Sequence, residues 1–83
     1  MKIIYTRHAE EKLRQEDTRK FKIKKKTIEN ILKYSRSKSK TKYGDLAALS
    51  EVDSKHDLRI IYSIIDKTAK VITFHISRKG RYK

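Results

Sequence analysis

The stretch Leu58-Arg59-Ile60-Ile61-Tyr62-Ser63-Ile64-Ile65 decides the fold, because it holds the longest nearly uninterrupted apolar run of the chain. Isoleucine and tyrosine favour extended backbone, so we expect a strand over residues 58–65 at the centre of a sheet. The run is far shorter than the roughly 20 apolar residues that a membrane-spanning helix needs. We therefore expect no membrane span and a fold organised around this strand.

The segments on either side of this strand continue the sheet. Residues 66–69 (Asp-Lys-Thr-Ala) predict a tight reversal, and residues 70–76 are rich enough in valine, isoleucine, threonine and phenylalanine to form the next strand. Before the central strand, Leu46 to Val52 predicts another strand, and residues 53–57 predict the turn that follows it. We interpret residues 77–83 as a basic tail.

The N-terminal half predicts one strand and then two helices. Residues 2–6 are strand-forming, and Thr6 can cap a helix that runs from Arg7 to about Arg19. A second helix is expected from Thr27 to Tyr34, where apolar residues recur at helical spacing. The polar, hydroxyl-rich segment 35–41 predicts a basic loop.

The predicted order of elements is β-α-α-β-β-β, an α+β fold. Two N-terminal helices of this kind can bury their apolar stripes only against one face of an antiparallel sheet. The chain has no proline and only two glycines, so no linker divides it, and we expect a single domain over residues 1–83. An exposed edge strand leaves the oligomeric state open.

The composition is strongly basic. The chain has 23 Lys and Arg against 10 Asp and Glu, which gives a net charge of +13. The segment from Arg19 to Lys42 holds eleven basic residues and one acid, Glu29. Such a field attracts RNA or another polyanion, although a high lysine content can also serve solubility alone. The chain has no cysteine and reaches charge too early for a signal peptide, so we expect a cytoplasmic protein.

Three segments resemble the RelE/ParE toxin superfamily. Residues 5–13 are similar to the start of a related uncharacterised bacterial and phage-borne family, with Lys12 where arginine is more usual. Residues 58–62 resemble the superfamily's central strand, and residues 71–82 resemble its last strand and its tail with arginine and tyrosine. The resemblance covers nearly the whole chain. It implies a RelE/ParE-like fold and a toxin that either cleaves messenger RNA on the ribosome or poisons DNA gyrase.

Metal-independent cleavage of RNA needs cations that hold the phosphate, a base for the ribose 2′-hydroxyl and an acid for the leaving oxygen. Arg59, on the central strand, is the first catalytic candidate, because a guanidinium suits phosphate; the alternative is a structural salt bridge. The carboxylates considered for that salt bridge are Asp45, Glu51 and Asp57. The resemblance adds Arg78 and Arg81 as phosphate clamps and Tyr82 as a residue that stacks on a base or takes part in proton transfer. The alternative for these three is a frayed, solvated tail.

His75 is a further catalytic candidate. Its ordinary pKa suits acid–base work near neutral pH, and strand alternation places it on a polar face with Thr73 and Ser77. The alternative is a partly buried histidine that is hydrogen-bonded within the sheet. We expect His8 to be a neutral hydrogen-bonding residue in the first turn of its helix, and His56 to be exposed in a turn.

Lys38, Lys40 and Lys42 complete the predicted RNA-binding set with Arg81, as non-specific phosphate contacts. No metal, cofactor or nucleophile motif occurs, so we expect no cofactor. The resemblance implies a metal-independent, ribosome-dependent mRNA endoribonuclease that acts as the toxin of a type II toxin–antitoxin pair. The expected partners are RNA and a cognate antitoxin. The alternative is a non-enzymatic member of the same fold that poisons gyrase or binds nucleic acid, in which Arg59 is structural.

Overall fold

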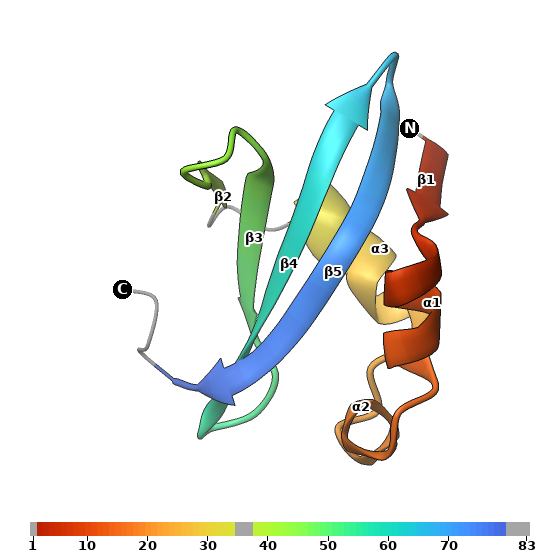
Figure 1. Ribbon diagram of the computed structural model, residues 1–83. Coiled ribbons are helices and arrows are strands. Elements are labelled where there is room, and N and C mark those ends of the chain that lie inside the picture. The colour runs from red at the N-terminus through yellow and green to blue at the C-terminus, as the bar shows by residue number, and fades with distance from the viewer. Residues whose placement is uncertain (1, 35–37, 80–83) are drawn as a thin grey trace.

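The sheet is centred on the two strands that the sequence places at its middle. The computed structural model describes residues 2–34 and 38–79. β4 (His56–Ile65) and β5 (Thr68–Arg78) form a long antiparallel pair, and β3 (Leu46–Glu51) pairs with the other side of β4 (Figure 1). The β-branched and aromatic residues of β4 and β5 account for these two strands, as predicted.

The two edges of the sheet differ in direction and in character. β1 (Lys2–Tyr5) runs parallel to β5, whereas β2 (Lys38–Lys40) runs antiparallel to β3, so the order is β1-β5-β4-β3-β2 and the sheet is mixed. Ile3 and Tyr5 hold β1 in place because they pack against the core. β2 consists of exposed lysine and serine, and charged edge strands of this kind discourage pairing with other chains.

In the part of the chain that the structure describes, three helices lie on one side of the sheet (Figure 1). α1 (Arg7–Leu13) packs against β5, α2 (Glu16–Lys20) follows it, and α3 (Lys25–Tyr34) packs against β3. The core lies between these helices and the sheet. Its fully buried side chains come from both layers and include Ala9, Ile28, Leu32, Leu58, Ile60, Val71 and Phe74.

The start of α1 confirms the predicted cap. The Thr6 Oγ1 accepts a hydrogen bond from the Ala9 backbone N at 3.1 Å and donates one to the Ile72 carbonyl at 2.8 Å. The side chain therefore both satisfies a free helix N–H and ties the helix to β5. This tie directs α1 along the edge of β5 beyond the short β1.

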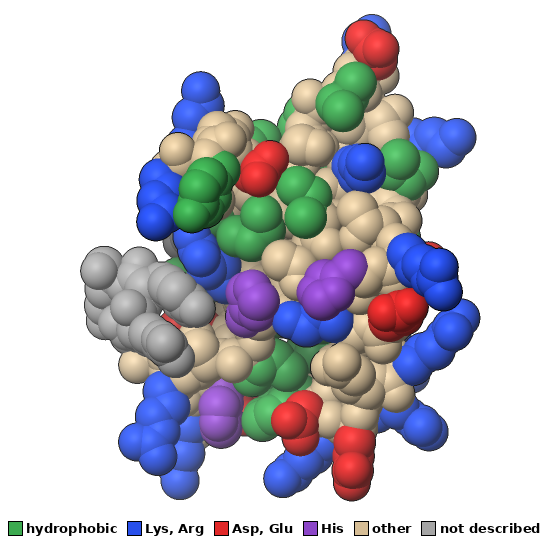
Figure 2. Space-filling view, in the orientation of Figure 1, with side chains coloured by type: hydrophobic (Ala, Val, Ile, Leu, Met, Phe, Trp, Pro, Cys, Tyr) green, Lys and Arg blue, Asp and Glu red, His purple; other side chains and the backbone are tan. Residues whose placement is uncertain are grey.

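Alternation along β4 separates two faces of the sheet. Leu58, Ile60 and Tyr62 are buried on what we call the helix-facing side. Arg59 and Ile61, between them, point to the opposite side, which we call the outer face. Residues of β5 that pair with Arg59 and Ile61 also lie on the outer face. The helices lie behind the sheet in Figure 1, so the outer face is the surface that faces the viewer in Figures 1 and 2.

The α+β class is confirmed, whereas the predicted order of elements is wrong in three respects. The single helix expected over residues 7–19 is two helices, because Gln15 has extended backbone (φ −70°, ψ 149°) and begins α2 after α1 has ended. The sheet is mixed rather than antiparallel, because β1 pairs parallel to β5. The predicted loop over residues 35–41 contains β2. The helix count and the strand order therefore differ from the expected RelE/ParE-like arrangement.

The reversal predicted at residues 66–69 is confirmed as a two-residue hairpin turn. Asp66 and Lys67 have φ of 49° and 64°, and Ile65 pairs with Thr68. Two consecutive left-handed residues form a type I′ turn, which favours asparagine or aspartate followed by glycine. Asp66 suits its position, whereas Lys67 pays the steric cost of a side chain in the left-handed region.

We expect Lys67→Gly to raise the free energy of unfolding by about 0.5–1 kcal/mol, because glycine removes that steric cost. Urea unfolding followed by circular dichroism measures the change. The control is Lys70→Gly, within β5, which should lower the same free energy by about 0.5–1 kcal/mol because glycine weakens a strand. A lower urea midpoint for Lys67→Gly would contradict the turn assignment.

Candidate nucleic-acid interface

Arg59 and His75 lie opposite each other on the outer face. They are register partners on β4 and β5, and Leu49 of β3 is the partner of Arg59 on its other side. Arg59 is half-buried, whereas His75 is exposed. Figure 2 shows histidine side chains and a Lys or Arg side chain gathered at the middle of this face, with hydrophobic side chains beyond them.

Lys12 reaches the same place from α1. Its Nζ donates to the Phe74 carbonyl, and it lies 3.1 Å from the His75 Nδ1 and 3.5 Å from the Thr73 Oγ1. β1 pairs with β5 only as far as Val71, so the edge of β5 beyond that point is open to a side chain from α1. Lys12, Arg59 and His75 therefore converge from three elements, and we call them the outer-face centre.

Burial and neighbouring cations set the protonation of the outer-face centre. Partial burial lowers the pKa of His75 below its usual value, and electrostatic repulsion from Lys12 and Arg59 lowers it further. Burial also lowers the pKa of Lys12. His75 is therefore neutral at pH 7. Because the Lys12 ammonium is a donor, neutral His75 accepts at Nδ1 and carries its proton at Nε2.

We expect the pKa of His75, followed by NMR titration, to rise toward its ordinary value of about 6.5 in Lys12→Met, because one of the neighbouring cations is removed. The lowered pKa of His75 also makes the stability of the fold depend on pH. His75 has a lowered pKa in the folded state, so its contribution to stability is complete above the unfolded-state pKa and is lost as the pH falls below it. The loss on acidification should be smaller in Lys12→Met. Lys67→Met is the control and should leave the titration of His75 unchanged; an equal shift in both variants would contradict the contact.

The outer-face centre can bind a phosphate group. It offers an ammonium, a guanidinium and an imidazole Nε2–H, and hydrogen bonds from charged donors to anions are the strong ones. The lowered pKa of Lys12 favours its neutral amine more than an exposed lysine would. Both the cations that metal-independent cleavage needs and a candidate base are thus brought together.

If Arg59 instead forms a structural salt bridge, candidate carboxylate partners lie on the same face of the sheet. Glu51 and Asp57 are register partners on β3 and β4, and Asp57 shares the outer face with Arg59 by alternation. Glu51 forms an ion pair with Lys79. A structural role for Arg59 and a phosphate contact are both compatible with its half-buried position.

Arg78 is not part of the outer-face centre. It is the register partner of His56, whose ring lies 4.8 Å from the ring of Phe21, at the end of α2. Arg78 therefore lies on the helix-facing side. It is three residues after His75, and strand alternation places the two on opposite faces. The structure therefore does not bring Arg78 together with Arg59 on the outer face. Arg81 and Tyr82 lie outside the described residues.

The three predicted RNA-binding lysines lie at the β2 edge and do not join the outer-face centre. The Lys38 Nζ donates to the Leu32 carbonyl at 2.9 Å, so Lys38 caps the end of α3 on the helix-facing side. Lys40 alternates with it on the same side, by its register with Leu46. The Lys42 Nζ lies 5.1 Å from the centroid of the Tyr43 ring, and both residues are exposed.

Lys12 is the functional candidate that the sequence reasoning missed. The sequence drew attention to it only through the family resemblance, as the position at which arginine is more usual. The available signal was its spacing from His8, because two residues four apart lie on the same face of a helix. His56 also differs from the prediction: it is half-buried in β4, and its Nδ1 lies 3.0 Å from the Asp53 Oδ1.

The residues that the structure describes hold neither a metal cluster nor a membrane-spanning helix. Over residues 2–34 and 38–79, no cluster of three or more His, Cys, Asp or Glu side chains could hold a metal ion. In the same part of the chain, no helix is long and apolar enough to span a bilayer. Comparisons with family models, with curated proteins and with solved structures find none that matches this chain.

Proposed function

We propose that this protein binds RNA on the outer face of its sheet and cleaves it without a metal ion, as a toxin. The observation that carries the proposal is the convergence of Lys12, Arg59 and His75 on one point of that face. The net charge of +13 supports an RNA strand as the ligand. The cleavage step also rests on the resemblance of residues 58–62 and 71–82 to RelE/ParE toxins. That resemblance further supports a cytoplasmic setting, messenger RNA on the ribosome as substrate and an antitoxin as partner.

The contact between Lys12 and His75 gives the cleavage a complete proton path. Arg59 holds the phosphate while the ribose 2′-oxygen attacks phosphorus. This path starts from the protein in which Lys12 has lost its proton: the Lys12 amine accepts the 2′-proton and passes a proton to the His75 Nδ1 as the His75 Nε2–H protonates the departing 5′-oxygen. The phosphorus–O5′ bond breaks, and the products are a 2′,3′-cyclic phosphate and a 5′-hydroxyl. No metal takes part in this path.

A second candidate function is supported by the same contact. When Lys12 is charged, its ammonium occupies the His75 Nδ1, so all three residues of the outer-face centre are donors. Three donors suit the holding of a phosphate without proton transfer. The protein would then be a non-enzymatic nucleic-acid binder, or a toxin that poisons DNA gyrase.

The test is induced expression in a heterologous bacterium, with growth and transcript ends followed. We expect the wild type to arrest growth and to create internal transcript ends with 5′-hydroxyls, and Arg59→Ala and Lys12→Met to abolish both effects. Lys67→Ala is the control and should behave as the wild type. Growth arrest with intact transcripts would favour the second candidate, and normal growth with soluble, folded protein would reject a toxin.

A further inference from the structure

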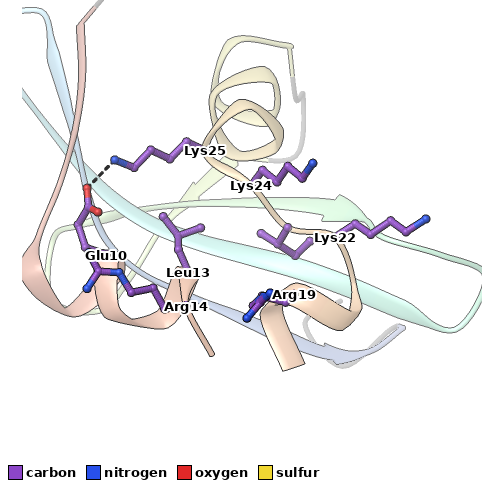
Figure 3. Close-up of a pocket in the computed structure, with 8 residues that line it drawn as sticks. Glu10, Leu13, Arg14, Arg19, Lys22, Lys24 and Lys25 are labelled. Atoms are coloured by element: carbon purple, nitrogen blue, oxygen red, sulfur yellow. Dashed lines mark ion pairs between the residues drawn. The ribbon is translucent and has the colours of Figure 1, made fainter. Parts of the chain in front are cut away.

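A second basic site lies among the helices, away from the outer-face centre. A cavity of about 480 Å³ opens between α1, α2 and the start of α3. Its volume falls in the range of about 300–1,000 Å³ that small-molecule sites occupy. Figure 3 shows the lining side chains, which come from all three helices and from the segment before α3. None of them belongs to the outer-face centre, so the inference below does not rest on the proposed function.

The charge of this cavity is unbalanced. Five of its eight lining residues are cationic: Arg14, Arg19, Lys22, Lys24 and Lys25. The one carboxylate, Glu10, is already engaged, because its Oε1 lies 2.7 Å from the Lys25 Nζ (Figure 3). Among the described residues, no carboxylate forms an ion pair with the other four cations. Like charges around one cavity repel, and a bound anion would relieve that repulsion.

Two features of the cavity wall at and just before the start of α3 destabilise the protein. Lys24, Lys25 and Lys26 stand at the helix N-terminus, and its first turn has no acidic residue, although the helix dipole favours negative charge there. Lys22 has a φ of 58°, which costs a non-glycine residue about 1–2 kcal/mol. A polyanion in the cavity would offset the first of these costs directly.

The floor of the cavity is apolar. It is formed by Leu13, half-buried on α1, and by Ile23, which is 4% exposed. Phosphate alone would not use such a surface, whereas a purine or pyrimidine ring can pack on it. The combination of an apolar floor and a cationic rim matches a molecule with a planar apolar part and several phosphates. We propose that this cavity binds a nucleoside polyphosphate.

The test is a titration of the full chain with adenosine triphosphate by isothermal calorimetry at low salt. We expect the triphosphate to bind at least tenfold more tightly than either pyrophosphate or adenosine, because only the triphosphate uses both the rim and the floor. The double variant Arg14→Gln/Arg19→Gln should weaken its binding at least tenfold. The matched control Lys33→Gln/Lys67→Gln removes the same charge elsewhere and should leave the affinity unchanged.

Three results would overturn the proposal. Pyrophosphate that binds as tightly as the triphosphate would show that the floor is unused. Equal weakening in both double variants, with urea midpoints equal to that of the wild type, would show a general charge effect. A competition titration adds a short RNA to the wild type with adenosine triphosphate bound. Displacement of the nucleotide by an RNA that binds more tightly than the triphosphate would make a nucleic-acid strand the occupant. Loss of RNA cleavage in Arg59→Ala has no bearing on this titration, so the two proposals fail independently.

Discussion

Ile60→Ala is expected to lower the free energy of unfolding by about 2–5 kcal/mol. Ile60 is fully buried at the centre of β4, and truncation of such a side chain to alanine costs about 2–5 kcal/mol. The total stability of a chain of 83 residues is on the order of 4–12 kcal/mol. The substitution therefore removes between about a sixth of the stability and all of it, and the melting temperature should fall by at least about 8 °C.

Ile65→Ala is the matched control for this prediction. It makes the same chemical change in the same strand, but Ile65 is 59% exposed. We expect the free energy of unfolding to change by less than about 0.5 kcal/mol, as for most surface substitutions. Thermal unfolding of both variants by circular dichroism measures the difference. Similar losses in the two variants would mean that the helix-facing side of β4 is not the core.

Affinity for single-stranded RNA is expected to fall a few hundredfold between 50 and 200 mM salt, if about six phosphates are contacted. The reason is that each contact releases a counterion, and each contributes about 0.7 to the slope of log affinity against log salt. Fluorescence anisotropy with a short labelled RNA measures this slope. A slope near zero would exclude phosphate contacts as the main source of binding.

The double variant Lys12→Met/Arg59→Met is expected to reduce that slope by about 1.4, because two phosphate contacts are lost. Its affinity at 50 mM salt should fall by about tenfold or more, since contacts to phosphate from charged donors are strong. Lys33→Met/Lys67→Met removes the same net charge from α3 and from the hairpin turn. If this control loses as much affinity and as much slope, RNA binds through general charge and the outer-face centre is not the interface.

The strands and the hairpin turn could be predicted from the sequence, because local composition is enough to identify them. Residues 58–65 are β-branched and apolar, and Asp66 begins a turn by its own side-chain preference. The pairing of β1 with β5 could not be predicted, since its direction depends on contacts between residues far apart in the chain. β2 could not be predicted either, because lysine and serine have no strand preference and only its pairing with β3 makes it a strand.

The candidate site was predicted in part for the same physical reasons. Alternation placed His75 on a polar face, and the register then confirms that it stands beside Arg59. Strand alternation also places Arg78, three residues after His75, on the opposite face, so their separation could be predicted from the sequence. Lys12 could be placed only by the structure, because its contact with His75 depends on α1 lying along the edge of β5.

The parallel pairing of β1 with β5 has a consequence for synthesis of the protein. Thr6 and Ile72, which join the start of α1 to β5, are 66 positions apart in the chain. Neither the pairing of β1 with β5 nor the contact between Lys12 and His75 can form before β5 has emerged from the ribosome. Contacts between such distant residues also slow folding. A growing chain therefore carries no assembled outer-face centre, and the translating ribosome is exposed to it only after β5 has been completed.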